Sequence, residues 1–259
     1  MKKLLALMAL VWVGLAQPVG AVQQSDDTRR AQVHTELGSG YYSMGKLGIA
    51  LEELNEAVRS DSKYAPAYYI LGLVYMELRE DAKAEENFQR ALNLDPANSE
   101  AHNNYGWFLC QSNRVDDAIG HFMTALKNPL YATPEVAYLN AGLCLLKKGD
   151  EKGGEELLLR AIKYQTVPPQ ALFQLSELNL RRGSYGDAQF YLERLFKASA
   201  PNSESLWLGA RIAHRMGNRE MEANYGLQLR KKFPDSREAL AYRNGEFDYA
   251  AKTKIEVRK

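Results

Sequence analysis

Apolar residues in this chain recur at helical spacing within short segments, and the segments come in repeating pairs. A row of small residues marks the first segment of each pair, at intervals of 34 or 36 residues: Gly38, Gly72, Gly106, Gly142, Ser176 and Ala210. The second segment carries another small residue and, four positions later, a large apolar one: Ala50 and Leu54, Ala84 and Phe88, Ala118 and Phe122, Gly154 and Leu158, Ala188 and Leu192. Because residues four apart share one helix face, the pattern predicts helical hairpins whose two helices approach closely at the small residues.

Residues that tolerate a left-handed backbone mark the turn inside each pair. Gly45, Asn113, Gly149, Gly183 and Gly217 fall in one phase, and Arg79 lies midway between Gly45 and Asn113. Glycine, and after it asparagine, adopts a positive φ at the lowest cost. Gly149 follows Asn113 by 36 residues rather than 34, so two residues are inserted, and we place them in the loop 129–134.

One period matches a known repeat closely. Residues 68–75 read Tyr-x-x-Leu-Gly-x-x-Tyr, and Ala84, Phe88, Ala91 and Pro96 follow. This is the tetratricopeptide pattern, in which each repeat is a helical hairpin of 34 residues. The sequence therefore predicts an all-α fold, a tetratricopeptide-repeat superhelix (α-solenoid) of six hairpins, at 31–64, 65–98, 99–132, 135–168, 169–202 and 203–236.

The last repeat departs from the pattern. Its small residue is Ala223, one position late, and Gly226 stands where a large residue is expected. Terminal repeats are often atypical because they cap the stack. Ser236 is a favourable N-cap, so we expect a capping helix over residues 237–243 and place the repeat region at 29–244. The tail 245–259 has weak periodicity and is expected to fray.

The N-terminus predicts export. Lys2 and Lys3 precede a 13-residue apolar run, and small residues follow as far as Ala21. This order is typical of a secretory signal peptide, here residues 1–21, cleaved after Ala21. A membrane anchor is the alternative, but the run is shorter than the roughly 20 apolar residues of a spanning helix.

After cleavage we expect a short polar lead-in at 22–28 and a first helix that starts near Thr28. The signal peptide predicts that the mature chain is periplasmic. No cysteine stands near the cleavage site, so the mature chain is expected to carry no N-terminal lipid. It would then be soluble, and peripheral at the outer membrane only through its partners.

Composition narrows the classes of partner and site. The 33 basic and 32 acidic residues give a net charge of +1, which is no reason to expect nucleic acid as a partner. Cys110 and Cys144 lie on first helices that should be neighbours, and neither has a CxxC partner, so a metal site is not expected. In an exported protein they could form a disulfide. We favour the other interpretation, two buried small apolar residues.

No catalytic motif stands out. The four histidines, His34, His102, His121 and His214, are spread over three repeats, and the chain lacks the HExxH, GxSxG and phosphate-loop patterns. The acidic pairs at 116–117 and 155–156 lie on second helices, where acidic residues in a first turn offset the helix dipole. We therefore expect no enzyme activity, no catalytic or metal site, no cofactor and no small-molecule substrate.

The informative surface is the inner face of the solenoid, which first helices line in this architecture. Places two, five, nine, twelve and thirteen of each repeat face inwards. We define the inner groove by the residues at these places that could bind a partner: Tyr42, Tyr69, Leu73, Met76, Asn103, Trp107, Leu139, Leu143, Leu146, Phe173 and Trp207. A basic end follows, with Arg211, His214 and Arg215.

A contiguous exposed apolar surface usually marks a partner site, and an amphipathic helix or an extended peptide fits a groove of this kind. We expect about half of these side chains to bury against the adjacent first helix. Trp107 is the residue we most expect to contact a partner.

Three less common segments carry a more specific resemblance. Residues 103–109 read Asn-Asn-Tyr-Gly-Trp-Phe-Leu; Leu-Tyr at 130–131 precedes Asn-Ala-Gly-Leu at 140–143; and Ser-Leu-Trp-Leu-Gly at 205–209 precedes Asn-Tyr-Gly-Leu-Gln-Leu-Arg at 224–230 and Phe-Pro at 233–234. Together they resemble the type IV pilus biogenesis and stability family, PilF/PilW, over nearly the whole mature chain.

The resemblance implies an exported six-repeat protein, without enzyme activity, that helps the pilus secretin assemble in the outer membrane and supports twitching motility. Its partner would be that secretin or another pilus-assembly protein. Members of this family are often lipoproteins, and the missing cysteine favours a soluble periplasmic factor here. Two alternatives stay open: a periplasmic scaffold for envelope or cell-wall assembly, and an enzyme with an unrecognised site.

Overall fold

The computed structural model describes residues 26–248, and within that range the chain forms thirteen helices and no strand. The expected signal peptide at 1–21 and its cleavage site lie outside the described residues, as do most of the lead-in and residues 249–259. The first helix begins at Asp26, two residues before the expected start at Thr28. The carboxylates of Asp26 and Asp27 favour this earlier start because they offset the positive end of the helix dipole.

The helices form six hairpins and a closing helix. The first helices are α1 (Asp26–Ser43), α3 (Ala65–Glu77), α5 (Ser99–Gln111), α7 (Pro134–Lys148), α9 (Pro169–Arg181) and α11 (Ser203–Arg215). The second helices are α2 (Leu47–Ser60), α4 (Asp81–Leu94), α6 (Val115–Ala125), α8 (Glu151–Ala161), α10 (Tyr185–Ala198) and α12 (Arg219–Lys232). The closing helix α13 (Arg237–Asn244) begins after Ser236, whose side chain accepts a hydrogen bond from the Ala239 amide, as an N-cap should.

One contact sets the approach of the two helices in each hairpin. A Cβ added at Gly72 would lie 2.8 Å from the Phe88 ring, and one at Gly142 would lie 2.9 Å from the Leu158 side chain. Gly38 and Gly106 meet Leu54 and Phe122 in the same way. Ser176 adds a polar version of this contact, because its hydroxyl donates to the Ala188 carbonyl over 2.8 Å. The predicted hairpin contacts are confirmed.

The turns inside the hairpins are also confirmed. The backbone is left-handed at each predicted position: Gly45, Arg79, Asn113, Gly149, Gly183 and Gly217 have φ of 71°, 62°, 63°, 92°, 79° and 70°. Arg79 and Asn113 are the two non-glycine residues with positive φ in the described part of the chain. The repeat phase thus overrides the usual preference for glycine at both places.

The sixth hairpin corrects one sequence expectation. Ala223 is exposed and is not its close-contact residue. A Cβ added at Gly209 of α11 would lie 2.7 Å from the Tyr225 ring, so the close contact is at Gly209 and not at Ala210, one residue earlier than expected. Gly226 is small because Tyr242 of α13 packs directly against it. The residue that seemed to break the pattern therefore makes room for the closing helix.

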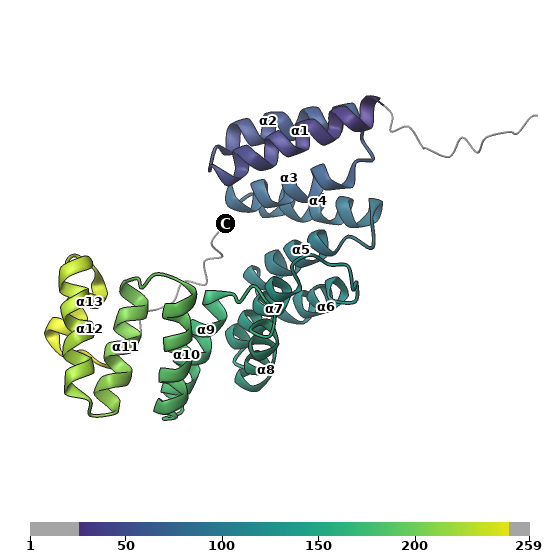
Figure 1. The fold of residues 1–259 in the computed structure, drawn as a ribbon. Coiled ribbons are helices and arrows are strands. Elements are labelled where there is room, and N and C mark those ends of the chain that lie inside the picture. The colour runs from purple at the N-terminus through teal and green to yellow at the C-terminus, as the bar shows by residue number, and fades with distance from the viewer. Residues whose placement is uncertain (1–25, 249–259) are drawn as a thin grey trace, which may run out of the picture.

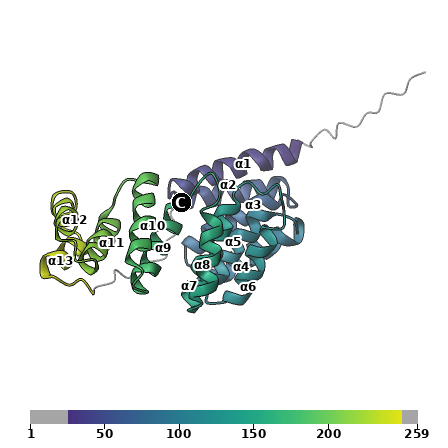
Figure 2. The same ribbon diagram turned by 60° about the horizontal axis from the view of Figure 1, so that its bottom comes forward.

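The hairpins stack in chain order along a curved line, with α1 and α13 at opposite ends (Figures 1 and 2). First helices contact one another along α1, α3, α5 and α7, and again between α9 and α11. The fourth and fifth hairpins are joined by α8 against α9. The first helices thus form the inner layer that carries the candidate site.

Candidate functional site

The N-terminal part of the inner groove is apolar and partly open. Tyr42 of α1 and Tyr69, Leu73 and Met76 of α3 are all half-buried. Tyr69 and Leu73 pack against two core clusters, so the buried part of each side chain is held in place by the core. Burial, and after it the charge of Glu77, raises the pKa of Tyr42 to about 12, so its hydroxyl stays protonated and can donate. These four residues form the surface that a partner can reach most directly, and we call them the α1–α3 patch.

The middle of the inner groove is more closed than the sequence indicates. Asn103, Trp107, Leu143, Phe173 and Trp207 are 4%, 6%, 3%, 7% and 1% exposed. Trp107 is therefore buried, and does not offer the open surface that the expected contact with a partner requires. Adjacent first helices touch, so a bulky side chain at place nine fills the space between them instead of projecting from the groove.

Two half-buried leucines and a polar contact complete this middle section. Leu139 and Leu146 of α7 keep part of their surface open and pack on the core formed around Leu158. Asn140 donates to Asn103 over 3.1 Å, which satisfies two buried amides across α5 and α7. About half of the inner groove is thus accessible, as expected, in two separate parts.

Acidic partners balance the basic end. Arg211 lies 2.5 Å from Glu177, and the two side chains are 8% and 16% exposed. They occupy place nine of successive repeats, 34 residues apart. Arg215 pairs with Asp248, and His214 lies 3.0 Å from Glu222. The signal for the buried pair was present in the sequence, as opposite charges at one place of neighbouring repeats.

The start of the C-terminal tail lies on this basic end. Phe247 stacks on Trp207 with ring centroids 5.5 Å apart, and on His214 with centroids 3.8 Å apart. Residues 245–248 are therefore placed against α11 and do not fray as expected, because Phe247 has an aromatic surface to cover. Weak periodicity in the sequence gave no sign of this contact.

Cys110 and Cys144 form a disulfide between α5 and α7, with their Cα atoms 5.8 Å apart. The interpretation we favoured, two unpaired buried residues, is therefore wrong. Contact between adjacent first helices brings the two thiols into the range that a disulfide requires. Beside this bridge, Lys147 donates to the Cys110 carbonyl over 2.8 Å and so satisfies the end of α5.

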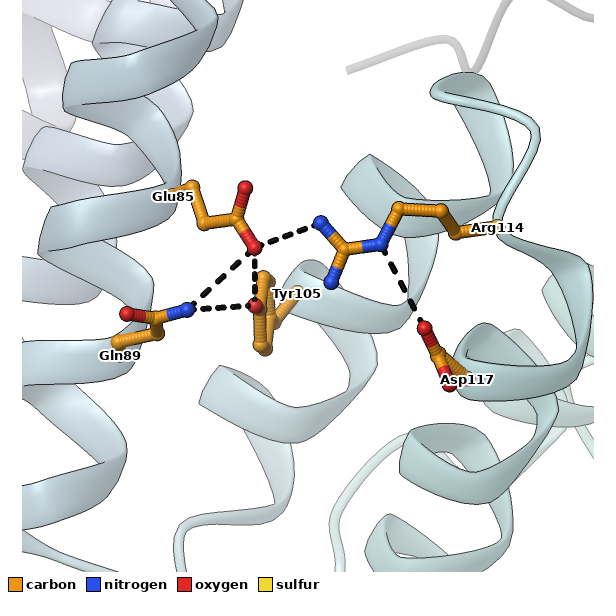
Figure 3. A network of polar contacts seen from close by, with 5 residues as sticks. All are labelled: Glu85, Gln89, Tyr105, Arg114 and Asp117. Atoms are coloured by element: carbon orange, nitrogen blue, oxygen red, sulfur yellow. Dashed lines mark hydrogen bonds and ion pairs between the residues drawn. The ribbon is translucent and has the colours of Figure 1, made fainter.

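A polar network ties the second hairpin to the third (Figure 3). Glu85 of α4 accepts hydrogen bonds from Tyr105 at 2.8 Å and from Arg114 at 2.6 Å. Partial burial alone would raise the pKa of Glu85, but the hydrogen bonds from Arg114 and Tyr105 outweigh it and lower that pKa. Gln89 and Asp117 complete the network. Every member has a partner within the protein, so we assign the network to repeat packing.

Among the described residues, His, Cys, Asp and Glu nowhere gather in threes that could hold a metal ion. Within residues 26–248 each helix is too short or too polar to cross a membrane.

The chain resembles known proteins both in its single repeats and over most of its length. Sequence models of the tetratricopeptide repeat match residues 38–78, 65–98 and 87–127. The type IV pilus assembly protein PilF of Pseudomonas aeruginosa is 29% identical over 241 residues, covering 90% of this chain and 95% of that protein.

Two solved structures agree with that relationship. PilW, a widely conserved type IV pilus biogenesis factor, is 32% identical, with a TM-score of 0.75 and coverage of 82% of this chain and 97% of PilW. The structure of PilF from Pseudomonas aeruginosa superposes with a TM-score of 0.77 at 26% identity, over 85% of this chain and all of that one.

Proposed function

The chain belongs to the type IV pilus biogenesis family that includes PilW and PilF, and from that premise we propose that it is a non-enzymatic periplasmic scaffold for pilus assembly. Its partner is the outer-membrane secretin or another pilus-assembly protein, which it helps to assemble or to stay stable. The observation that carries the proposal is the extent of the likeness, which covers 97% of PilW rather than single repeats.

The α1–α3 patch is the surface proposed to bind the partner. It combines two tyrosines with two flexible apolar side chains, none of them fully buried. Central aromatic residues usually carry most of the energy of such an interface, with a loss of about 2 kcal/mol or more on truncation. The patch therefore fits an apolar segment, as an amphipathic helix or an extended strand.

The test uses a strain that lacks this gene, complemented with variants. Tyr42→Ser combined with Met76→Gln removes the ring and the thioether while leaving side chains that tolerate water. The matched control is Phe190→Ser, which changes a 54% exposed aromatic residue on the second helix α10. We expect fewer secretin multimers on immunoblots and loss of surface pili in the double variant alone.

Circular dichroism of the purified variants checks that each stays helical. Normal multimers and normal pili in a folded double variant would contradict the role of the patch. The convex face and the loop 129–134, where Leu130 is 88% exposed, would then be the surfaces to test.

Export is part of the same proposal. The basic start and the apolar run of residues 1–21 support cleavage after Ala21 and release without lipid. Intact-mass measurement on protein from the native envelope should give a chain that begins at Val22. A different start, or added acyl mass, would overturn this part.

A further inference from the structure

The end of the described chain returns to the inner face of the solenoid. Helix α13 ends at Asn244 and is capped by Gly245, where φ is 71°. The Gly245 amide donates to the Tyr242 carbonyl over 3.1 Å, and the Glu246 amide donates to the Ala241 carbonyl over 2.9 Å. This left-handed closing turn directs the next two residues, Phe247 and Asp248, onto α11.

Phe247 contacts residues of α11 at places that face the inside of the solenoid. Trp207 is at place five and His214 at place twelve, the phase that lines the inner face in every repeat. The rings of Phe247 and His214 are parallel within 1°, and those of Phe247 and Trp207 within 23°. The segment therefore lies where an external peptide ligand would lie, with an aromatic side chain stacked on an aromatic wall.

Asp248 offsets part of the positive charge in the same region. A pocket of about 380 Å³ lies between the ends of α9 and α11. Its lining includes four arginines and the two tail residues: Arg181, Arg182, Arg211, Arg215, Phe247 and Asp248.

Acids of the repeats pair with three of these arginines. Arg181 and Arg182 contact Glu151, and Arg182 also contacts Glu155. Arg211 contacts Glu177. Arg215 pairs with Asp248 from the tail. Without Asp248 the pocket therefore has one more positive than negative group, which favours an acidic side chain.

The tail is held loosely. The Asp248 side chain is 90% exposed and that of Arg215 is 47% exposed. An ion pair this open to water is weak, and the Phe247 ring adds its contacts with Trp207, His214 and Tyr242. Such a contact survives because the tail is tethered beside its site, and a stronger free ligand can displace it.

We propose that Trp207, His214 and Arg215, with Arg181 beside them, form a docking site for an extended peptide segment in which an aromatic residue directly precedes an acidic one. Phe247 and Asp248 occupy this site in the free protein and lower its affinity for a partner. The inference rests on the proposed function in one respect, namely that the displacing segment belongs to a pilus-assembly partner.

The experiment measures binding of a labelled copy of residues 245–250, Gly-Glu-Phe-Asp-Tyr-Ala, by fluorescence anisotropy. The mature wild-type protein is compared with a Phe247→Ala, Asp248→Ala double variant that empties the site. If the tail fills the site nine-tenths of the time, emptying it tightens binding about tenfold. Adding Arg215→Ser to the emptied variant should abolish the gain, and a peptide with alanine and lysine in place of Phe-Asp should not bind.

Glu246→Ala is the matched control, because it alters an exposed neighbour of the pair and should leave the wild-type affinity unchanged. Asp248→Ala alone changes an open side chain, keeps the fold and should give a smaller gain than the double variant. Equal affinity in wild-type and emptied protein, or no binding by the emptied protein, would overturn the proposal and reduce the segment to a cap on α11.

The two proposals fail separately. Peptide binding without any effect of gene loss on pili would leave this site standing and remove the pilus function. Loss of pili without peptide binding would do the reverse.

Discussion

Single residues set the distance between the helices of each hairpin. Gly72 has no side chain, and the Phe88 ring fills the space where a Cβ would stand, 2.8 Å from its nearest ring atoms. Gly72→Leu should therefore overpack the second hairpin and lower the free energy of unfolding by about 1–3 kcal/mol. Thermal melting followed by circular dichroism measures the loss.

The matched control is Gly120→Leu, on α6. No atom lies within 4 Å of a Cβ at Gly120, so the same substitution adds bulk to open space. It should leave the melting temperature unchanged or raise it, since leucine is the better helix former. Equal melting of wild type and Gly72→Leu would mean that the Gly72–Phe88 contact does not limit the hairpin.

Two histidines form a contact that depends on their protonation. His102 donates from Nε2 to the Pro96 carbonyl at 3.1 Å, so in its neutral form its Nδ1 is an acceptor. His121 Nδ1 then donates to it over 2.8 Å. Burial, and after it the charge of His102, lowers the pKa of His121; Asp117 opposes this shift and Arg114 adds to it.

A lowered pKa makes stability depend on pH in a definite direction. Below its ordinary pKa of about 6.5, His121 binds a proton more readily in the unfolded chain than in the folded one. Stability should therefore fall as pH drops below about 6.5, through this residue. Melting temperatures at pH 7.5 and 5.5 test it: His121→Gln should show a smaller drop than wild type, and an equal or larger drop would contradict the assignment.

The sequence predicts contacts within a hairpin better than contacts between hairpins. Gly72 and Phe88 are fixed by a repeat that has one packing solution. Trp107 has the right phase to face inwards, but whether it projects or fills a gap depends on the distance between α5 and its neighbours, which no single repeat encodes. Charge was the usable signal between repeats, since Glu177 and Arg211 stand at one place of adjacent repeats.

At the scale of elements, the disulfide joins two first helices that already touch. Cys110 on α5 and Cys144 on α7 are 34 residues apart. Closing a loop of that length restricts the unfolded chain, so the bridge should contribute about 2–4 kcal/mol. Replacing both cysteines with alanine, or reducing the bridge, should lower the melting temperature accordingly.

Non-reducing peptide mapping of protein from the periplasm is the direct check on the pairing. Two free thiols there would contradict it. In that case replacing both cysteines with alanine should cost only the packing contribution of the two sulfur atoms. The same mapping after reduction serves as the control.

The closing helix shows where repeat analysis reaches its limit. Ser236 and the helix after it were predictable, because an N-cap and helical spacing are local signals. Gly226 was not, since its partner Tyr242 lies outside the repeat. Gly226, which departs from the repeat pattern, is thus required by the packing of the closing helix α13.

At the scale of the whole molecule, the two ends of the stack differ from its middle. Val33 and Leu37 of α1 are 49% and 45% exposed, while Ala67 and Leu71, at the same places of the next repeat, are 0% and 3% exposed. A preceding hairpin covers those places in later repeats, and among the described helices α1 packs only on α2 and α3. The N-terminal hairpin therefore has a neighbour on one side only.

Stability in such a stack is close to a sum of repeat and neighbour contributions, so it should vary along the chain. The third and fourth hairpins share the disulfide and the cluster around Phe122, with neighbours on both sides. We expect amide hydrogen exchange, followed by mass spectrometry, to be slowest in α5 and α7 and fastest in α1, α2 and α13. Replacing Cys110 and Cys144 should raise exchange in the middle and leave α1 and α2 unchanged, because hairpins beyond the nearest neighbour are only weakly coupled. Uniform exchange along the chain, or an equal rise everywhere, would mean that the solenoid opens as one cooperative unit.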